Sequence, residues 1–163
     1  MTARETADGY FAAVAARDLD AMGGFWHDEL VTDLVPIGVF RGPEALREFF
    51  AELFAAVPDL DFAVRRTSVD GDVASVEWRL SGTFSGGPFQ EIEPTGRRIE
   101  LRGVDCVEIA AGKIVRNTAY YDGAAFARSI GMLPPRDSGT EQAMTAGFNA
   151  LTKLRRTLKE IPR

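Results

Sequence analysis

Helical and extended hydrophobic patterns alternate in the first half of the chain. Residues 3–17 carry apolar side chains at helical spacing, and a shorter helical pattern begins after Asp18, a residue type that caps helices well. This second pattern includes hydrophobic residues as far as Trp26. An extended segment at 30–35 and a third helix over 41–57 follow. This half of the chain therefore predicts three helices and one strand.

From residue 60 onward the hydrophobic period changes from a helical one to two. Alternating segments occupy 60–65, 73–84, 98–109 and 114–121, and short connections join the last of them. Strands with such short connections pair antiparallel, so we expect a four-stranded meander. Helices followed by a run of strands indicate an α+β fold rather than a parallel α/β fold.

A short helix starting at Asp122 and a long helix over 140–160 complete the pattern, with a linker that contains Pro and Gly between them. An isolated helix of this length is marginal in water. We therefore expect the long helix to pack through its apolar stripe on the rest of its own chain or on a partner subunit. The stripe consists of Met144, Phe148, Leu151, Leu154 and Leu158.

The composition indicates one ordinary globular domain. The chain has 163 residues, 45% of them hydrophobic and 26% charged, and a formal net charge of −5. A mildly acidic chain lacks the electrostatic signature of a nucleic-acid or anionic-membrane partner, so we expect neither. One cysteine, Cys106, excludes an intrachain disulfide, and one histidine, His27, excludes a histidine-only zinc site. Without a secretory leader or a membrane-spanning apolar run, the sequence predicts a cytoplasmic protein.

Five short motifs, in this order along the chain, resemble those of the SnoaL-like polyketide cyclase family. They are Ser-Gly-Thr-Phe at 81–84, Pro-Thr-Gly-Arg at 94–97, Gly-Lys-Ile at 112–114, Tyr-Tyr-Asp at 120–122 and Ile-Gly-Met-Leu-Pro at 130–134. Two positions depart from the family pattern: Phe84 replaces a histidine and Thr118 replaces a tryptophan. The family belongs to the nuclear-transport-factor-2-like superfamily, together with ketosteroid isomerases and limonene epoxide hydrolases.

The resemblance implies a cone-shaped α+β barrel, in which a curved antiparallel sheet wraps around the N-terminal helices. Residues 1–135 would form this barrel. Residues 136–163 would be an added helical extension, packed on the barrel or on a partner subunit.

The resemblance also implies two catalytic carboxylates. Asp122 matches the family aspartate and would be the general base, since a carboxylate among apolar groups acquires a raised pKa. The alternative is that Asp122 only caps the helix that follows it. Asp105 resembles the protonated oxyanion-hole aspartate of ketosteroid isomerases. Its alternative is a salt bridge with one of three arginines, which are Arg79, Arg102 and Arg116.

Two further positions resemble ketosteroid isomerase residues. Tyr10 matches the tyrosine of the same oxyanion hole, although a tyrosine on an amphipathic helix is also common as plain core. Asp33 falls at the position of the isomerase base when residues are counted backwards from Gly42, whereas a forward count from Asp20 reaches Leu34. A shift of one residue turns a strand side chain to the other face, so both assignments remain open.

A hydrophobic pocket is expected along one face of the segment 73–84. Its substrate-binding residues would be Trp78, Leu80, Phe84, Tyr120, Asp33 and Trp26. The alternative is that the same apolar face is simply the core. Trp78 and Leu80 occupy the positions at which epoxide hydrolases have an Arg-x-Asp pair, which argues against epoxide hydrolysis.

Two functions of different classes follow from this pattern. The first is a cyclase or isomerase that works without metal or cofactor and removes a proton α to a carbonyl of a polyketide-like or steroid-like substrate. The second is a non-catalytic module that binds an apolar small molecule, which the missing motif histidine favours. Val104 and Cys106 alternate with other apolar residues in one strand, so the sheet is apolar on both sides. We therefore expect a homodimer through the outer faces of the sheets.

Overall fold

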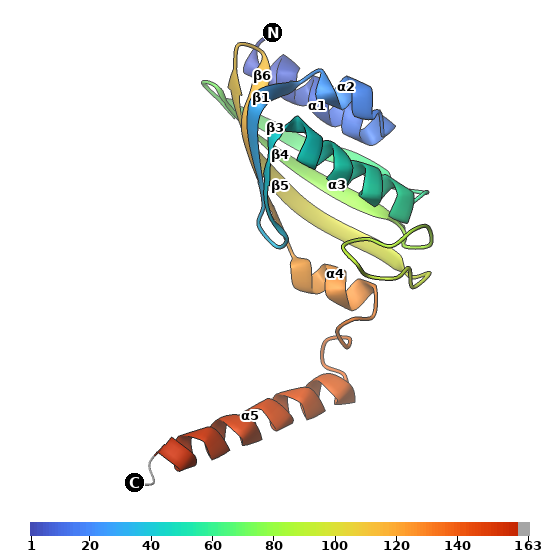
Figure 1. The fold of residues 1–163 in the computed structure, drawn as a ribbon, viewed down its shortest axis with the longest axis vertical. Helices are drawn as coiled ribbons and strands as arrows, with labels where there is room; N and C mark the ends of the chain where they lie inside the picture. Colours follow the sequence, from blue (N-terminus) through green and yellow to red (C-terminus); the bar gives the residue numbers. More distant parts are fainter. Residues whose placement is uncertain (160–163) are drawn as a thin grey trace.

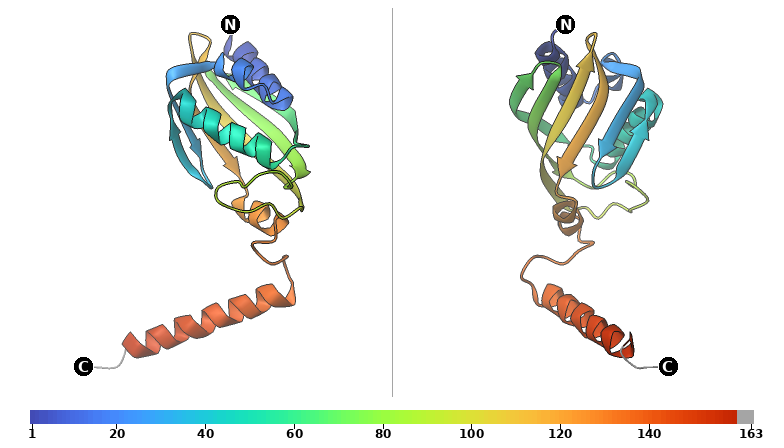
Figure 2. Two further views of the ribbon diagram at one scale, coloured as in Figure 1. Left: turned by 45° about the vertical axis from the view of Figure 1, so that its right-hand side comes forward. Right: turned by 90° about the vertical axis from the view of Figure 1, so that its left-hand side faces the viewer.

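A curved six-stranded sheet and three helices that cover its concave face form the body of the protein (Figures 1 and 2). The computed structural model describes residues 1–159, with side chains as far as Arg156. The predicted α+β class and the curved sheet around the N-terminal helices are confirmed. The helices are α1 (Ala3–Ala16), α2 (Leu19–Gly23), α3 (Gly42–Ala56), α4 (Gly123–Ser129) and α5 (Gly139–Lys159), and the strands are β1 (Trp26–Leu34), β2 (Gly38–Arg41), β3 (Asp61–Asp70), β4 (Val73–Thr83), β5 (Arg98–Ala110) and β6 (Lys113–Tyr121).

Local sequence signals begin and end the first helices. Thr2 and Glu5 form a capping box at the start of α1, and Arg17 closes the helix in a left-handed conformation. The Asp18 side chain accepts hydrogen bonds from the first amides of α2, as its residue type predicts. Pro43 occupies the first turn of α3, where a missing N–H costs nothing.

The sheet order is β2-β1-β6-β5-β4-β3. All neighbouring pairs are antiparallel except β1 and β6, which run parallel. The meander β3–β6 is therefore confirmed. Strand β2 was not predicted, because its four residues lie between a proline turn and a helix and are too few for a period to emerge.

The chain enters the sheet earlier than the helical pattern after Asp18 suggested. Helix α2 ends at Gly23, and Gly24 caps it. Strand β1 then begins at Trp26, which pairs with Ile114 of β6. Trp26 is thus a strand residue: the glycine pair stops the helix, and the open edge of β6 provides hydrogen bonds for an extended chain.

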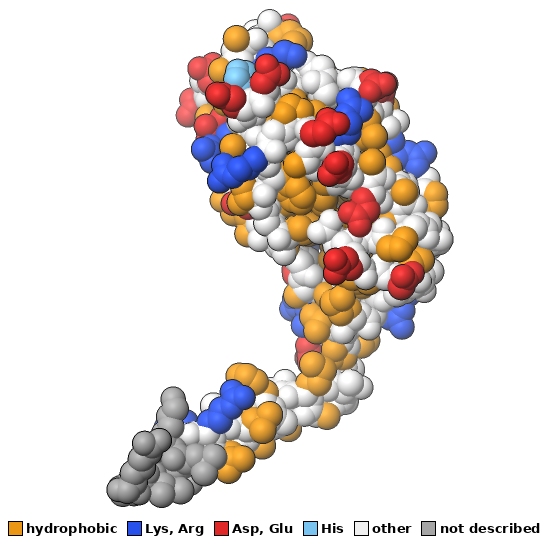
Figure 3. All heavy atoms as spheres, in the orientation of Figure 1, with side chains coloured by type: hydrophobic (Ala, Val, Ile, Leu, Met, Phe, Trp, Pro, Cys, Tyr) orange, Lys and Arg blue, Asp and Glu red, His pale blue; other side chains and the backbone are white. Residues whose placement is uncertain are grey.

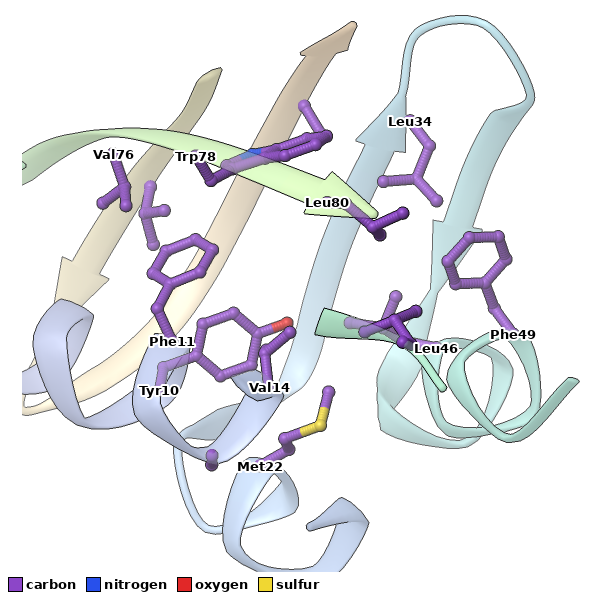
Figure 4. Packing of buried hydrophobic residues seen from close by; sticks show 14 of the residues in the cluster. Tyr10, Phe11, Val14, Met22, Leu34, Leu46, Phe49, Val76, Trp78 and Leu80 are labelled. Atoms are coloured by element: carbon purple, nitrogen blue, oxygen red, sulfur yellow. The ribbon is translucent and has the colours of Figure 1, made fainter. Parts of the chain in front are cut away.

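The core lies between the concave face of the sheet and helices α1 to α3. Side chains at alternate positions of β4 point into it, which confirms the inward face predicted for this strand. Figure 4 shows Val76, Trp78 and Leu80 facing Tyr10 and Phe11 of α1. The buried set on β4 and just after it is Ala74, Val76, Trp78, Leu80 and Phe84.

Helix α5 forms, but it does not pack on its own barrel. Figures 1 and 2 show it standing away from the sheet beyond α4. Every described residue of α5 from Gln142 to Arg156 is exposed. The expectation of packing on the same chain is therefore wrong for these residues, and packing on a partner subunit stays a proposal. Leu158 and Glu160, also part of the predicted helix, lie outside the residues whose side chains are described.

Candidate active site

A cavity of about 360 Å³ lies between the concave face of the sheet and helices α1, α3 and α4. Its walls are almost entirely apolar, and aromatic side chains dominate them. Figure 4 shows how Tyr10 from α1, Trp78 and Leu80 from β4, Leu34 from β1 and Phe49 from α3 surround this space. A hydrophobic small molecule is the kind of ligand that such walls accept.

One ionisable carboxyl group faces this apolar space. Asp105, in the middle of β5, is only 6% exposed and belongs to the cavity lining. Trp78 Nε1 donates a hydrogen bond to its Oδ1 at 2.7 Å, and Asn117 Nδ2 donates one to its Oδ2 at 2.6 Å. Burial raises the pKa of the Asp105 carboxyl to about 6, while the hydrogen bonds from Asn117 and Trp78 counteract part of this effect.

The three residues of this cluster meet because their strands are neighbours. In the sheet, β5 lies between β4 and β6, so Trp78 reaches Asp105 from one side and Asn117 reaches it from the other. Asp105 turns inward and does not form the salt bridge considered for it. Two of the arginines considered as its partners, Arg79 and Arg116, pair instead with Glu100 and Glu108.

Two tyrosine hydroxyls also line the cavity. Tyr10 of α1 is 3% exposed, and burial raises the pKa of its hydroxyl far above the usual range, to which the nearby Asp105 carboxylate adds. Tyr121, at the end of β6, is half-buried, and burial raises the pKa of its hydroxyl to about 12. Both hydroxyls therefore keep their protons at neutral pH and can donate hydrogen bonds.

The inward face of β6 differs from the expected one. A bulge lies in β6 where the pairing passes from Arg116 to Ile114, so that one residue of β6 has no partner in β5. Beyond it, Asn117, Ala119 and Tyr121 point inward. The prediction that Tyr120 and Asp122 face the pocket requires the even-numbered residues of this strand to point inward, and the bulge reverses that orientation.

Two residues predicted for the pocket consequently lie outside it. Tyr120 is 51% exposed on the outer face, so it does not line the cavity. Asp122 is exposed as well: its side chain caps α4 by accepting a hydrogen bond from Ala125 N at 2.9 Å, and it lies 3.7 Å from the Arg136 guanidinium. The two carboxylates that the resemblance implied therefore do not share one pocket: Asp105 lines the apolar cavity, whereas Asp122 lies beside charged residues of the outer face such as Arg79 and Glu100.

The other predicted residues divide between wall, core and outer face. Trp78 and Leu80 line the cavity, while Trp26 and Phe84 are buried in the core without belonging to its lining. Asp33 lies between the buried residues Thr32 and Leu34 and therefore faces the other side of β1. On this strand the neighbouring residue Leu34 lines the cavity instead. The Asp33 carboxylate therefore does not reach the cavity as the isomerase base would.

Sequence reasoning missed two polar residues of the site, Asn117 and Tyr121. No periodic signal marked them, since the bulge moves them to the inward face. A signal for Asn117 did exist: it is a polar amide inside an apolar strand, beside a strand that carries an isolated aspartate. Such a pair of disfavoured residues on adjacent strands is best explained by a mutual hydrogen bond.

Gly103 lets the Trp78 indole lie flat across β5 and reach Asp105. A Cβ atom at Gly103 would lie 2.3 Å from Trp78 Cζ2 and 2.7 Å from the backbone oxygen of Tyr120. We expect Gly103→Ala to lower the free energy of unfolding by about 1–3 kcal/mol and to displace the indole. Urea denaturation followed by tryptophan fluorescence measures both effects. Gly87→Ala is the control, since a Cβ there meets nothing within 4 Å, and equal losses in both variants would contradict the prediction.

Among the described residues, no group of three or more His, Cys, Asp and Glu side chains could hold a metal ion. The helices within this same part of the chain include none that is long and apolar enough to cross a membrane. The polar side chains that line or contact the cavity among the described residues are the Asp105 cluster, the hydroxyls of Tyr10 and Tyr121, and the amide of Gln90, which donates a hydrogen bond to Glu52.

Comparison with known structures gives the same fold repeatedly. A candidate SnoaL-like polyketide cyclase from Jannaschia sp. CCS1 superimposes with a TM-score of 0.73 over 81% of this chain and 93% of its own, at 24% identity. AclR, a candidate hydroxylase from Streptomyces galilaeus, superimposes with a TM-score of 0.72 over 94% of this chain and 96% of its own, at 19% identity. IdmH, a candidate polyketide cyclase from Streptomyces antibioticus, superimposes with a TM-score of 0.69 over 80% of this chain and 99% of its own, at 22% identity.

Identities this low establish the fold alone. No curated protein matches the sequence. The SnoaL-like domain model, however, matches residues 7–117, which include β1 to β5, Asp105 and most of β6. Because this match extends over more than half of the chain, the protein belongs to the SnoaL-like domain family.

Proposed function

We propose that the protein is a cofactor-independent cyclase or isomerase that removes a proton α to a carbonyl group of a hydrophobic, polyketide-like or steroid-like substrate. The observation that carries this proposal is the Asp105 carboxyl group, buried in an apolar cavity with a pKa of about 6. A base whose pKa lies near the working pH is the most effective kind.

Asp105 acts as the base in this proposal, and not as the protonated hydrogen-bond donor suggested by the isomerase resemblance. With a pKa of about 6, the group is mostly ionised at pH 7. Trp78 and Asn117 each donate to one carboxylate oxygen, which fixes the group and leaves one lone pair on each oxygen for a proton. Asp122 has no place in this chemistry, because its exposed side chain caps α4.

The proposed step breaks a C–H bond next to the carbonyl. The proton moves to Asp105, and the electron pair moves onto the carbonyl oxygen to give an enolate. Tyr10 donates a hydrogen bond to that oxygen, as its hydroxyl remains protonated. Attack of the enolate carbon on a second carbonyl closes a ring, and the resulting alkoxide takes the proton back from Asp105. Without a second carbonyl, return of the proton to another carbon gives an isomerisation.

One observation favours the second candidate, a module that binds an apolar ligand without converting it. Both Asp105 oxygens already accept hydrogen bonds from the protein, which is also the arrangement of a purely structural buried carboxylate. A small hydrophobic ligand is the expected partner in both cases, and the two functions differ only in whether Asp105 exchanges protons with it.

Deuterium exchange distinguishes these functions without knowledge of the natural substrate. The protein is incubated in deuterated water with a panel of β-polyketones and 3-ketosteroids, and exchange α to the carbonyl is followed by mass spectrometry. We expect catalysed exchange whose kcat/KM rises about tenfold per pH unit below pH 6 and levels off above it. Ligand binding without any catalysed exchange across the panel would support the binding module instead.

We also propose a homodimer, for which the chain offers two surfaces. The outer face of the sheet carries Tyr120, Val104 and Cys106, but charged residues such as Arg102 and Glu108 interrupt it. The stripe on α5 is the more continuous apolar surface, because its described members Met144, Phe148, Leu151 and Leu154 follow one another at helical spacing and are each more than half exposed.

A further inference from the structure

Helix α5 exposes an apolar stripe that its own chain leaves uncovered. The stripe residues are 54–68% exposed, with Phe148 the most exposed of them. Figure 3 shows hydrophobic side chains standing on this helix in open solvent. A helix with such a stripe is stabilised by packing it against a partner. The members of this stripe whose side chains are described are Met144, Phe148, Leu151 and Leu154, and the name α5 stripe refers to these four below.

Contacts at its first turn direct α5 away from its own cavity. Arg128 of α4 forms an ion pair with Glu141 at 3.0 Å, and both side chains are partly buried. Glu141 also accepts a hydrogen bond from Asp137 N at 2.6 Å, and Ser138 caps the helix through Glu141 N. These bonds hold the start of α5 against α4, and the rest of the helix stands away from the sheet with its stripe exposed (Figure 1).

The cavity opens at a surface that is also apolar. Of its lining residues, Met132 is 58% exposed, Pro36 is exposed, and Ile37 and Ile92 are half-buried. We call these four residues the mouth. Exposed hydrophobic side chains that gather in this way are typical of binding surfaces, for ligands or for other proteins.

Charge distinguishes the helix from the surface around the mouth. Residues 139–163 hold five of the 19 Lys and Arg residues and two of the 24 Asp and Glu residues, a net charge of +3, so residues 1–138 carry −8. Glu91 and Glu93, both exposed, flank the mouth residue Ile92. Figure 3 shows acidic side chains spread over the face formed by α3 and the loop between β4 and β5.

The basic residues of α5 stand close to its stripe. Arg155 follows Leu151 by one helical turn, and Arg156 is adjacent to it. If Leu151 of one copy packed against Ile92 of another, the two guanidinium groups would come close to Glu91 and Glu93. At 21 residues, α5 is about 31 Å long, enough to cross the mouth and reach this loop.

We infer that α5 of one copy of this chain lies across the cavity mouth of a second copy, and that the second copy returns the same contact. Such an exchange is an isologous twofold interface. It covers the α5 stripe and closes the mouth at once, so each cavity is complete only in the dimer. The inference concerns assembly, and it holds whether the cavity catalyses a reaction or only binds a ligand.

The comparison with AclR provides an independent observation. The alignment with AclR covers 94% of this chain, which is more than residues 1–138 make up. The aligned region therefore extends into α5. The alignments with the Jannaschia protein and with IdmH cover only 81% and 80%. An extension beyond the barrel therefore occurs in a solved structure of the same fold.

Light scattering of the full chain tests the inference first. We expect twice the monomer mass of 17.8 kDa at micromolar concentration. Phe148→Glu places a charge in the stripe, and because the contact occurs twice per dimer, it should raise the dissociation constant about 100-fold or more. Asn149→Glu introduces the same residue on the polar side of α5 and should leave the mass unchanged. Circular dichroism verifies that both variants keep their fold.

Charge reversal tests which surface receives the helix. We expect Arg155→Glu with Arg156→Glu in one chain, and Glu91→Lys with Glu93→Lys in another, each to yield monomers. Mixed together, the two variants should form a heterodimer, because both exchanged contacts then join opposite charges. Pairing of α5 with α5 would instead leave the Glu91/Glu93 variant dimeric.

Three results would overturn the inference. A wild-type mass of 17.8 kDa at all concentrations would mean that α5 remains uncovered or folds back on its own chain. A dimer that persists in Phe148→Glu would place the interface on the outer face of the sheet. Reversed-charge variants that dimerise alone, or that fail to combine when mixed, would exclude the mouth as the receiving surface.

Discussion

Asp105→Asn is expected to reduce catalysed deuterium exchange by about 10²–10⁴-fold, the usual contribution of a positioned base. The substitution keeps the size of the side chain but removes the group that accepts the proton. Its amide has a single acceptor oxygen, so only one of the hydrogen bonds from Trp78 and Asn117 survives. Exchange rates measured at saturating substrate give kcat, so they show the loss in the chemical step separately from any change in substrate binding.

The matched control for this experiment is Asp122→Asn, the same replacement at the exposed carboxylate. The amide oxygen can still cap α4, so we expect both folding and exchange to remain close to those of the wild type. The opposite pattern, with exchange lost in Asp122→Asn and kept in Asp105→Asn, would refute the proposed base. Exchange retained in both variants would remove both carboxylates from the mechanism.

Asp105 is also expected to make the protein less stable as the pH rises. Its pKa is about 6 in the folded chain against a model value of 3.8, so the folded state holds the proton more tightly. The resulting stabilisation is complete below about pH 4 and disappears as the pH passes 6. A difference of about two pKa units corresponds to about 3 kcal/mol in the free energy of unfolding.

Urea denaturation of the wild type and of Asp105→Asn at pH 4 and pH 7 measures this contribution. The wild type should lose about 2.5 kcal/mol relative to the variant between pH 4 and pH 7, slightly less than the full value of about 3 kcal/mol, because the unfolded carboxyl is already partly ionised at pH 4. Exposed acids such as Glu5 and Asp59, whose hydrogen bonds lower their pKa, act in the opposite direction but are common to both proteins and cancel. If the difference in unfolding free energy between wild type and Asp105→Asn were the same at pH 4 and pH 7, burial would not have raised the pKa of Asp105.

The helices, the meander and the inward face of β4 could be predicted from the sequence because each depends on a regular local period. Residues Ala74 to Phe84 show this well: alternation with a period of two assigned their buried side before any partner strand was known. Asp105 was also identifiable, since an isolated aspartate among apolar strand residues needs a buried partner. Asp18 and Asp122 were recognisable as helix caps from residue type and position alone.

Tertiary structure decided which of these residues meet. The bulge in β6 is a one-residue event stabilised by cross-strand pairing with β5, and no period along β6 records it. Because of it, Asn117 and Tyr121 lie on the inward side of the sheet while Tyr120 faces outward, and Asp122 is an exposed helix cap. The sequence determined that an isolated aspartate stands inside an apolar strand, whereas its burial and its partners Trp78 and Asn117 depend on strand register, which only long-range pairing fixes.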